Sequence, residues 1–88
     1  MGTPFYVAPE MLENSVSGLF SDLWALGCII YELCSGYKMF QGARNQDVFS
    51  KILTNEVNYS HIRDKTAVDL IQQLCQIDPS NRIGLKDI

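Results

Sequence analysis

The sequence contains few of the residues that build metal centres and disulfide frameworks. Its 88 residues include one histidine, His61, and three cysteines, Cys28, Cys34 and Cys75. The cysteines are 6 and 41 positions apart, so there is no C-x-x-C pair, and His61 has no cysteine pair near it. We therefore expect no metal site and no disulfide framework, but three buried thiols in a reducing compartment.

Basic residues and long apolar runs are also scarce. Seven Lys and Arg against ten Asp and Glu give a net charge of −3, which argues against binding to nucleic acid or to an anionic membrane surface. The longest apolar run, 23–33, has 11 residues, whereas a membrane-spanning helix needs about 20. No targeting signal is visible, because Pro4 and Pro9 interrupt the first apolar stretch and no basic lead precedes it. These absences predict a cytoplasmic protein without membrane or nucleic-acid partners.

The composition that remains, 47% hydrophobic and 19% charged residues, is typical of a small globular domain. Pro9 suits the first position of a helix and places Glu10 near its positive end, which predicts a short helical turn over 8–12. A helix over 45–54, capped by Asn45, has one apolar face and one wet face. The apolar face consists of Val48, Phe49, Ile52 and Leu53.

The stretch 21–35 predicts a helix that is apolar on nearly every side. Ser21 or Asp22 can cap its start, and Ser35-Gly36 ends it. A helix that is hydrophobic all round has to be covered all round, which requires a larger body than 88 residues supply. We therefore expect the isolated chain to expose sides of this helix and to be loosely packed or prone to aggregation.

A further amphipathic helix is predicted over 64–77, with Asp64 or Thr66 at its start and Asp78-Pro79 beyond its end. Its core-facing residues are Ala67, Leu70, Ile71, Leu74 and Cys75. The residues 85–88 look like the first turn of another helix. Because no alternating strand pattern of convincing length is present, the predicted fold class is all-α with long ordered loops.

Three motifs occur in order along the chain: G-T-P-F-Y-V-A-P-E at 2–10, S-D-L-W-A-L-G at 21–27 and D-P-S-N-R at 78–82. Together they resemble the eukaryotic protein kinases of the serine/threonine class. The first is similar to the end of the activation loop with its A-P-E motif. The second is similar to the start of the central helix of the helical C-lobe, and the third to the loop whose arginine pairs with the A-P-E glutamate.

The resemblance covers essentially all of 1–88 and implies one partial kinase domain, the helical C-lobe portion of the bilobal fold. It assigns 1–12 to the end of the activation loop and the A-P-E segment, and 78–88 to the arginine loop and the start of the last helix. Within the family, residues 21–31 and 46–52 are similar to the phosphoinositide-dependent kinases.

The resemblance also implies roles for two groups of residues. In related kinases the threonine of the first motif, here Thr3, contacts the catalytic aspartate and lysine, and the residues after it receive the substrate next to the phosphoacceptor. The implied substrate-binding residues are Gly2, Thr3, Pro4, Phe5 and Tyr6. Because tyrosine kinases differ here, Gly2-Thr3 favours serine and threonine substrates. The implied structural residues are Glu10, Asp22, Trp24, Gly27 and Arg82.

These structural residues also have plain physical interpretations. Glu10 and Arg82 are 72 positions apart, and a guanidinium can hold a carboxylate through two parallel hydrogen bonds, although both can instead be solvated surface charges. Asp22 is either a helix cap or, as the resemblance implies, an acceptor for backbone amides of the catalytic loop. Trp24 and Gly27 are most simply explained by core packing and close helix approach.

The segments that carry out phosphoryl transfer are absent from this sequence. It has no G-x-G-x-x-G loop, and H-I-R-D at 61–64 is rejected as a catalytic H-R-D because it follows A-P-E, separates His from Arg and has Asp69 where Asn belongs. Asp64 is better explained as a helix cap. ATP and Mg²⁺ would therefore be bound by the N-lobe and catalytic loop of a parent domain, and by no residue of this chain.

We favour a fragment of an ATP-dependent serine/threonine kinase that covers the substrate side of the C-lobe and is inactive alone. Its partners would be a protein substrate with a Ser or Thr acceptor, the rest of the parent domain, and a regulator on the helix over 45–54. The alternative is a truncated, non-catalytic kinase that acts as a protein-interaction module through the same helix.

Overall fold

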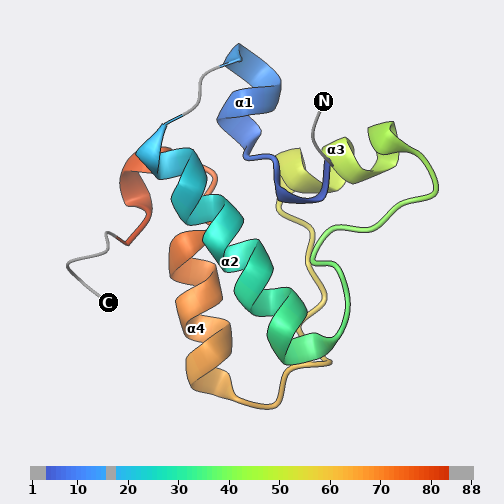
Figure 1. The fold of residues 1–88 in the computed structure, drawn as a ribbon, viewed down its shortest axis with the longest axis vertical. Coiled ribbons are helices and arrows are strands. Elements are labelled where there is room, and N and C mark those ends of the chain that lie inside the picture. Colours follow the sequence, from blue (N-terminus) through green and yellow to red (C-terminus); the bar gives the residue numbers. More distant parts are fainter. Residues whose placement is uncertain (1–3, 16–17, 84–88) are drawn as a thin grey trace.

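The computed structural model describes residues 4–15 and 18–83, and within these ranges it contains four α-helices and no strand (Figure 1). The all-α prediction is therefore confirmed for the described residues. The helices are α1 (Pro9–Asn14), α2 (Leu19–Ser35), α3 (Asn45–Thr54) and α4 (Lys65–Leu74). Short 3-10 turns, η1 (Pro4–Tyr6) and η2 (Pro79–Asn81), precede α1 and follow α4.

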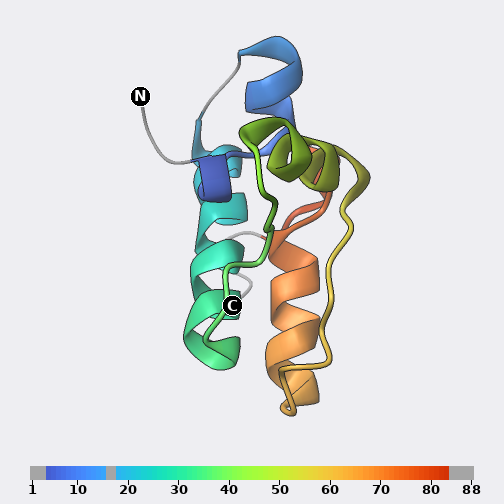
Figure 2. The same cartoon turned by 90° about the vertical axis from the view of Figure 1, so that its right-hand side faces the viewer.

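Helix α2 is the axis of the fold, and α4 runs antiparallel beside it in both views (Figures 1 and 2). Helices α1 and α3 and the turn η1 gather at the end of the molecule where α2 begins (Figure 1). The Cα radius of gyration is 12.2 Å, close to the ~12 Å expected for a compact chain of this length. The described residues therefore form one body around α2.

The start of α2 differs from the prediction. The helix begins at Leu19, two residues before position 21, and Gly18 occupies the N-cap position without a side-chain cap. The prediction that Ser21 or Asp22 caps this helix was therefore wrong, because both lie inside its first turns and the Ser21 hydroxyl is engaged by Glu10. The C-terminal end follows the prediction: Gly36 has a φ of 81°, and its N–H donates to the Glu32 carbonyl at 2.9 Å.

The starts of α3 and α4 can be compared with the helix caps predicted from the sequence. Helix α3 spans Asn45–Thr54, but its N-cap is Arg44 and not Asn45; the Arg44 N–H donates to the Asp47 carboxylate at 3.2 Å. Asp64 caps α4, because its Oδ1 accepts from the Thr66 N–H at 2.9 Å, which confirms its interpretation as a cap.

Helix α4 ends at Leu74 and not at position 77 as predicted. The reason lies in the returning chain: the N–H of Ile83 donates to the Gln73 carbonyl at 3.1 Å, and Arg82 Nε donates to the Gln76 carbonyl at 2.8 Å. Carbonyls at the end of a helix need partners, and here tertiary contacts supply them in place of another helical turn.

The core lies between α2, α3, α4 and the loop that follows α2. Trp24 and Phe40 are fully buried, and their rings stack with centroids 5.7 Å apart and planes 7° from parallel. Met39, the residue before Phe40, is also buried. Other fully buried side chains from α3 and α4 are Val48, Ile52, Ile71 and Leu74. Two residues of the predicted apolar face of α3, Val48 and Ile52, therefore serve the core of this chain.

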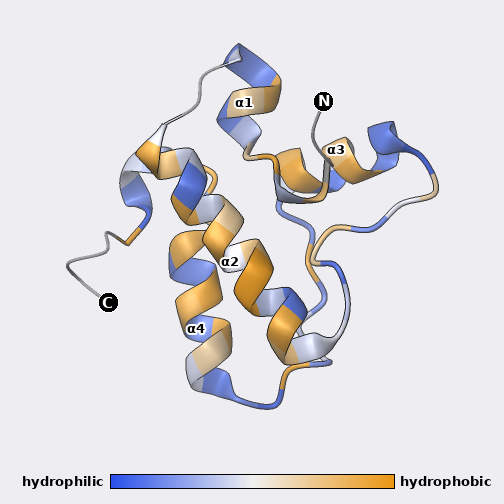
Figure 3. Ribbon diagram, in the orientation of Figure 1, coloured by the Kyte–Doolittle hydropathy of each residue, from blue (hydrophilic) through white to orange (hydrophobic). Residues whose placement is uncertain are grey.

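One flank of α2 is left uncovered by the described residues. Apolar residues follow most of this helix in Figure 3, and Leu19, Ile29 and Leu33 on this flank are between 45% and 81% exposed, while Phe20 in the first turn is 51% exposed. The predicted exposure of its sides is thus confirmed. Cys34 is exposed on the same helix, whereas Cys28 and Cys75 are buried, so the prediction of three buried thiols was wrong at Cys34. No helix in the described ranges is long and apolar enough to cross a membrane.

Candidate functional site

A buried ion pair joins the start of α1 to the loop after α4. Arg82 Nη1 donates to Glu10 Oε2 and Nη2 donates to Glu10 Oε1, each at 2.7 Å. This is the bidentate arrangement that a guanidinium and a carboxylate favour. The side chain of Arg82 is 0% exposed and that of Glu10 is 11% exposed. The structure thus brings these two predicted residues together across 72 positions and excludes two solvated surface charges.

The remaining contacts of Arg82 reach α2 and the end of α4. Nη1 also donates to the Phe20 carbonyl at 2.6 Å, and Nε donates to the Gln76 carbonyl. The guanidinium carbon lies 5.1 Å from the centre of the Trp24 ring, within range of a cation–π contact. The Arg82 side chain therefore links three parts of the chain: α1, the start of α2 and the segment after α4.

Ser21 is a partner of this pair that the sequence interpretation assigned to a helix cap. Its hydroxyl donates to Glu10 Oε2 at 2.8 Å, and Ser21 is only 6% exposed. A serine in the first turn of a largely apolar helix is the only local sign of this role. The Glu10 carboxylate is thus satisfied by charge and by hydrogen bonds within the described residues.

Burial raises the pKa of Glu10, but hydrogen bonds from Arg82 and Ser21 and the guanidinium charge outweigh it and leave that pKa below its usual value. A carboxyl whose pKa is lower in the folded state stabilises the fold above its unfolded pKa, and this contribution is lost as the pH falls. We expect the urea midpoint of the chain, followed by Trp24 fluorescence, to fall below about pH 5 and the fall to be smaller in Glu10→Gln.

Glu13→Gln is the matched control for this titration, because Glu13 is exposed on the same helix. Its curve of urea midpoint against pH should follow that of the unchanged chain. Equal slopes for the unchanged chain and Glu10→Gln between pH 7 and pH 3 would show that the Glu10 carboxyl is not a source of acid sensitivity.

The described part of the predicted substrate-binding segment is held by a second polar cluster. The Tyr6 hydroxyl donates to Glu32 Oε1 and accepts from Lys38 Nζ at 2.9 Å, while Lys38 Nζ also donates to both Glu32 oxygens at 3.2 Å. The ammonium lies 5.5 Å from the centre of the Phe5 ring and 5.2 Å from that of Tyr6. Gly2 and Thr3 lie outside the described residues.

Neither Glu32 nor Lys38 was singled out in the sequence. Hydrogen bonds from Tyr6 and Lys38 lower the pKa of Glu32, and hydrogen bonds to Tyr6 and Glu32 raise the pKa of Lys38. Both groups therefore stay charged at neutral pH. The cluster ties η1 to the end of α2, so Phe5 and Tyr6 have a fixed position beside that helix.

The other predicted structural residues lie on α2 and do not act alike. Asp22 is exposed, and its carboxylate makes no hydrogen bond with any residue in the ranges 4–15 and 18–83, so its predicted link to a catalytic loop stays a prediction. Trp24 is fully buried, and its indole Nε1 has no hydrogen-bond partner among the described residues.

Gly27 marks the closest approach of α2 to α4. A Cβ at this position would lie 2.3 Å from Cys75 Sγ and 3.1 Å from Leu74 Cβ, closer than such atoms pack. The Cys75 thiol donates to the Trp24 carbonyl at 3.5 Å, and a hydrogen bond with Cys28 together with burial raises its pKa. Cys75 is therefore a neutral packing group wedged against Gly27.

Nowhere among the described residues do three or more His, Cys, Asp or Glu side chains gather in a way that could hold a metal ion. His61 contacts the Tyr37 ring, and Asp64 caps α4, so both have contacts of their own within this chain. The site thus consists of the Arg82–Glu10 pair at the start of α2 and of the segment with Phe5 and Tyr6, which is held by the side chains of Glu32, near the end of α2, and Lys38, in the loop that follows.

The chain combines a central helix, an A-P-E segment and a buried arginine that pairs with the glutamate of that segment. This combination indicates the protein kinase class, and comparison with known families agrees. Residues 1–88 match the protein kinase domain over their whole length, so the chain belongs to the protein kinase domain family.

Curated relatives of the chain include proteins named as serine/threonine kinases. The chain is 39% identical over 84 residues to the probable serine/threonine-protein kinase pdkA of Dictyostelium discoideum, covering 96% of the chain and 12% of that protein. It is 37% identical over 92 residues to the serine/threonine-protein kinase ppk18 of Schizosaccharomyces pombe, covering 100% and 7%. With 3-phosphoinositide-dependent protein kinase 1 of Homo sapiens it shares 36% over 88 residues, covering 100% and 16%. The chain thus spans between 7% and 16% of the length of these relatives.

Proposed function

We propose that this chain is the substrate-side part of the helical lobe of an ATP-dependent serine/threonine protein kinase. The observation that carries the proposal is the Glu10–Arg82 pair, which anchors the A-P-E segment to the helical body at 2.7 Å. With that end fixed, the chain just before it, including Phe5 and Tyr6, has a defined place beside α2. Such a fixed surface is what a kinase needs to present a polypeptide to its catalytic groups.

In this proposal the residues of the chain position a protein substrate and do not transfer phosphate. Phe5 and Tyr6, held by Lys38 and Glu32, would receive the substrate next to its Ser or Thr acceptor, together with Gly2, Thr3 and Pro4. ATP and Mg²⁺ supply the phosphoryl group and its charge neutralisation in kinases. They would be bound by an N-lobe and a catalytic loop that this sequence does not contain, so the 88 residues alone should be inactive.

The test compares the 88-residue chain with the longest protein encoded by an open reading frame that contains it. We expect the longer protein to transfer phosphate from ATP to peptides with Ser or Thr acceptors but not to the matched Tyr peptides, and the 88-residue chain to transfer none. Transfer to Tyr peptides would contradict the proposed specificity. Transfer by the purified 88-residue chain, above a contaminating-kinase control, would contradict its role as a positioning part.

The alternative is a non-catalytic kinase relic that works as a protein-interaction module, and the uncovered flank of α2 favours it. Leu33 is 81% exposed and Leu19 is 62% exposed, which gives a partner an apolar surface. A regulator on α3 would meet mainly its polar face and Leu53, because Val48 and Ile52 are buried within the chain. An open reading frame that begins at Met1, with no kinase activity in its product, would support this alternative.

A further inference from the structure

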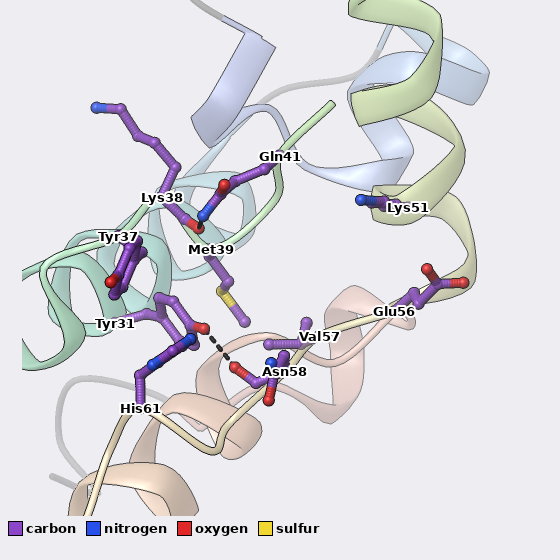
Figure 4. Close-up of a pocket in the computed structure, with 10 residues that line it drawn as sticks. All are labelled: Tyr31, Tyr37, Lys38, Met39, Gln41, Lys51, Glu56, Val57, Asn58 and His61. Carbon is purple, nitrogen blue, oxygen red and sulfur yellow. Dashed lines mark hydrogen bonds between the residues drawn. The ribbon is translucent and has the colours of Figure 1, made fainter. Parts of the chain in front are cut away.

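A cleft of about 410 Å³ lies between the loop that follows α2 and the extended segment that follows α3 (Figure 4). This volume is within the range of about 300–1,000 Å³ typical of ligand pockets. Tyr31 and Met39, both buried, form its floor, and the Tyr31 hydroxyl donates to the Asn58 carbonyl across it. The floor of the cleft is thus part of the packed core, and the function proposed above does not involve the cleft.

The two side walls of the cleft differ in chemistry. One wall carries the rings of Tyr37 and His61, with centroids 4.5 Å apart and planes tilted by 35°. The opposite wall carries Lys51, whose ammonium is directed into the cleft from the last turn of α3, and Glu56 at the rim (Figure 4). Neither Lys51 nor Glu56 forms a hydrogen bond through its side chain or an ion pair with another described residue.

The Lys38 ammonium does not add to the charge of the cleft. Figure 4 shows it directed away from the space that Tyr37, Lys51 and Val57 enclose, and its charge is taken by Glu32. Lys51, a half-exposed residue, is therefore the free cation that lines this cleft within the described ranges, and an acidic group is the natural partner of a free ammonium.

The third side of the cleft is formed by a segment outside the helices, residues 56–59. Residues 56–59 have no regular structure, and the backbone N–H of Val57 makes no hydrogen bond with the rest of the described chain. Unpaired main chain of this kind can pair with another extended segment, the mode by which many domains bind peptides. Main chain, an aromatic wall and one ammonium together suit a peptide better than a compact small molecule.

We propose that this cleft binds an extended peptide segment of a partner protein that carries one acidic side chain for Lys51 and an apolar or aromatic side chain for the wall of Tyr37 and His61. In an extended peptide that crosses the cleft from one wall to the other, alternate side chains point into the cleft, so the two groups should be two positions apart. Glu56 at the rim selects against a run of several acidic residues.

The cleft lies next to the segment that is proposed to receive the substrate. Lys38 lines the cleft with part of its chain and holds Phe5 and Tyr6 with its ammonium, so a peptide in the cleft lies one residue away from the segment proposed to receive substrate. This connection with substrate docking rests on the proposed function, whereas peptide binding itself does not.

The test is a fluorescence anisotropy titration of the 88-residue chain with labelled peptides of about nine residues. The probe has one Glu two positions from a Phe, and the comparison peptides have Gln or Lys in place of the Glu. We expect the Gln peptide to bind about five-fold more weakly, because a partly exposed ion pair contributes up to about 1 kcal/mol. Lys51→Met should remove this preference, and Lys51→Glu should reverse it toward the Lys peptide.

Lys65→Met is the matched control, because Lys65 is exposed at the start of α4 and does not line the cleft. It should keep the five-fold preference, and circular dichroism should show every variant to be as helical as the unchanged chain. Tyr37→Ala, at a half-exposed position, should weaken binding of the Phe peptide but not of a peptide with Ala in place of the Phe.

Equal affinity for the Glu and Gln peptides, an unchanged preference in Lys51→Met, or no binding at millimolar concentration would each overturn the inference. Because the titration needs no ATP and no phosphate transfer, an inactive longer protein with an intact peptide preference would overturn the proposed function alone. An active kinase whose chain shows no preference would overturn the cleft proposal alone.

Discussion

Replacing Arg82 by methionine should lower the free energy of unfolding by about 3–5 kcal/mol, because the variant leaves the Glu10 carboxylate buried without its charge partner. The guanidinium also satisfies the Phe20 and Gln76 carbonyls, which lose their donors. An 88-residue domain has a total stability of only about 4–13 kcal/mol, so much of the chain should be unfolded at 37 °C. Urea unfolding followed by Trp24 fluorescence measures the change.

The control for size and charge is Arg63→Met, because Arg63 is exposed and its loss should cost less than about 0.5 kcal/mol. The double variant Glu10→Leu with Arg82→Met removes both charges and should be at least about 1 kcal/mol more stable than Arg82→Met alone. Together with the single variant Glu10→Leu, these variants form a double-mutant cycle. If the loss in the double variant equals the sum of the losses in the two single variants, the two side chains do not stabilise each other.

Replacing Gly27 by valine should cost about 3 kcal/mol, because its branched side chain would meet Cys75 and Leu74 where even a Cβ has only 2.3 Å and 3.1 Å of space. Gly27→Ala should be milder, since the Cys75 thiol can turn aside and alanine favours the helix by about 1 kcal/mol over glycine. Thermal unfolding should show a large loss in midpoint for valine and a small one for alanine.

The cause can be isolated by repeating Gly27→Ala in a Cys75→Ala background, where the nearest obstacle is gone. There the substitution should be neutral or stabilising, a change of sign that only steric contact with Cys75 explains. Leu33→Val serves as the control for placing valine in α2, because Leu33 is 81% exposed and only helix propensity should change. A loss in Gly27→Val no larger than in Leu33→Val would contradict close packing at this point.

Features that depend on local patterns were predictable from the sequence. The Asp64 cap, the Gly36 stop and the span of α3 follow from residue types within one or two helical turns. The pairing of Glu10 with Arg82 is not local, and only the order of three family motifs pointed to it. Helix positions and this anchor therefore came from two different kinds of information.

Features set by contacts between distant segments were not predictable. Lys38 reaches Tyr6 because the loop after α2 passes beside η1, and nothing in the residues around position 38 encodes that path. Helix α4 ends early because Ile83 supplies a donor to the carbonyl of Gln73. In both cases a side chain or carbonyl found its partner only after the chain had packed.

The uncovered flank of α2 makes the stability of this chain depend on mass action. Leu33 and Ile29 are 81% and 45% exposed in the folded state, and any body that covers them binds the folded form in preference to the unfolded one. A partner at a hundred times its dissociation constant raises the free energy of unfolding by about 2.7 kcal/mol. The melting temperature of these 88 residues should therefore rise with the concentration of any partner that binds along α2.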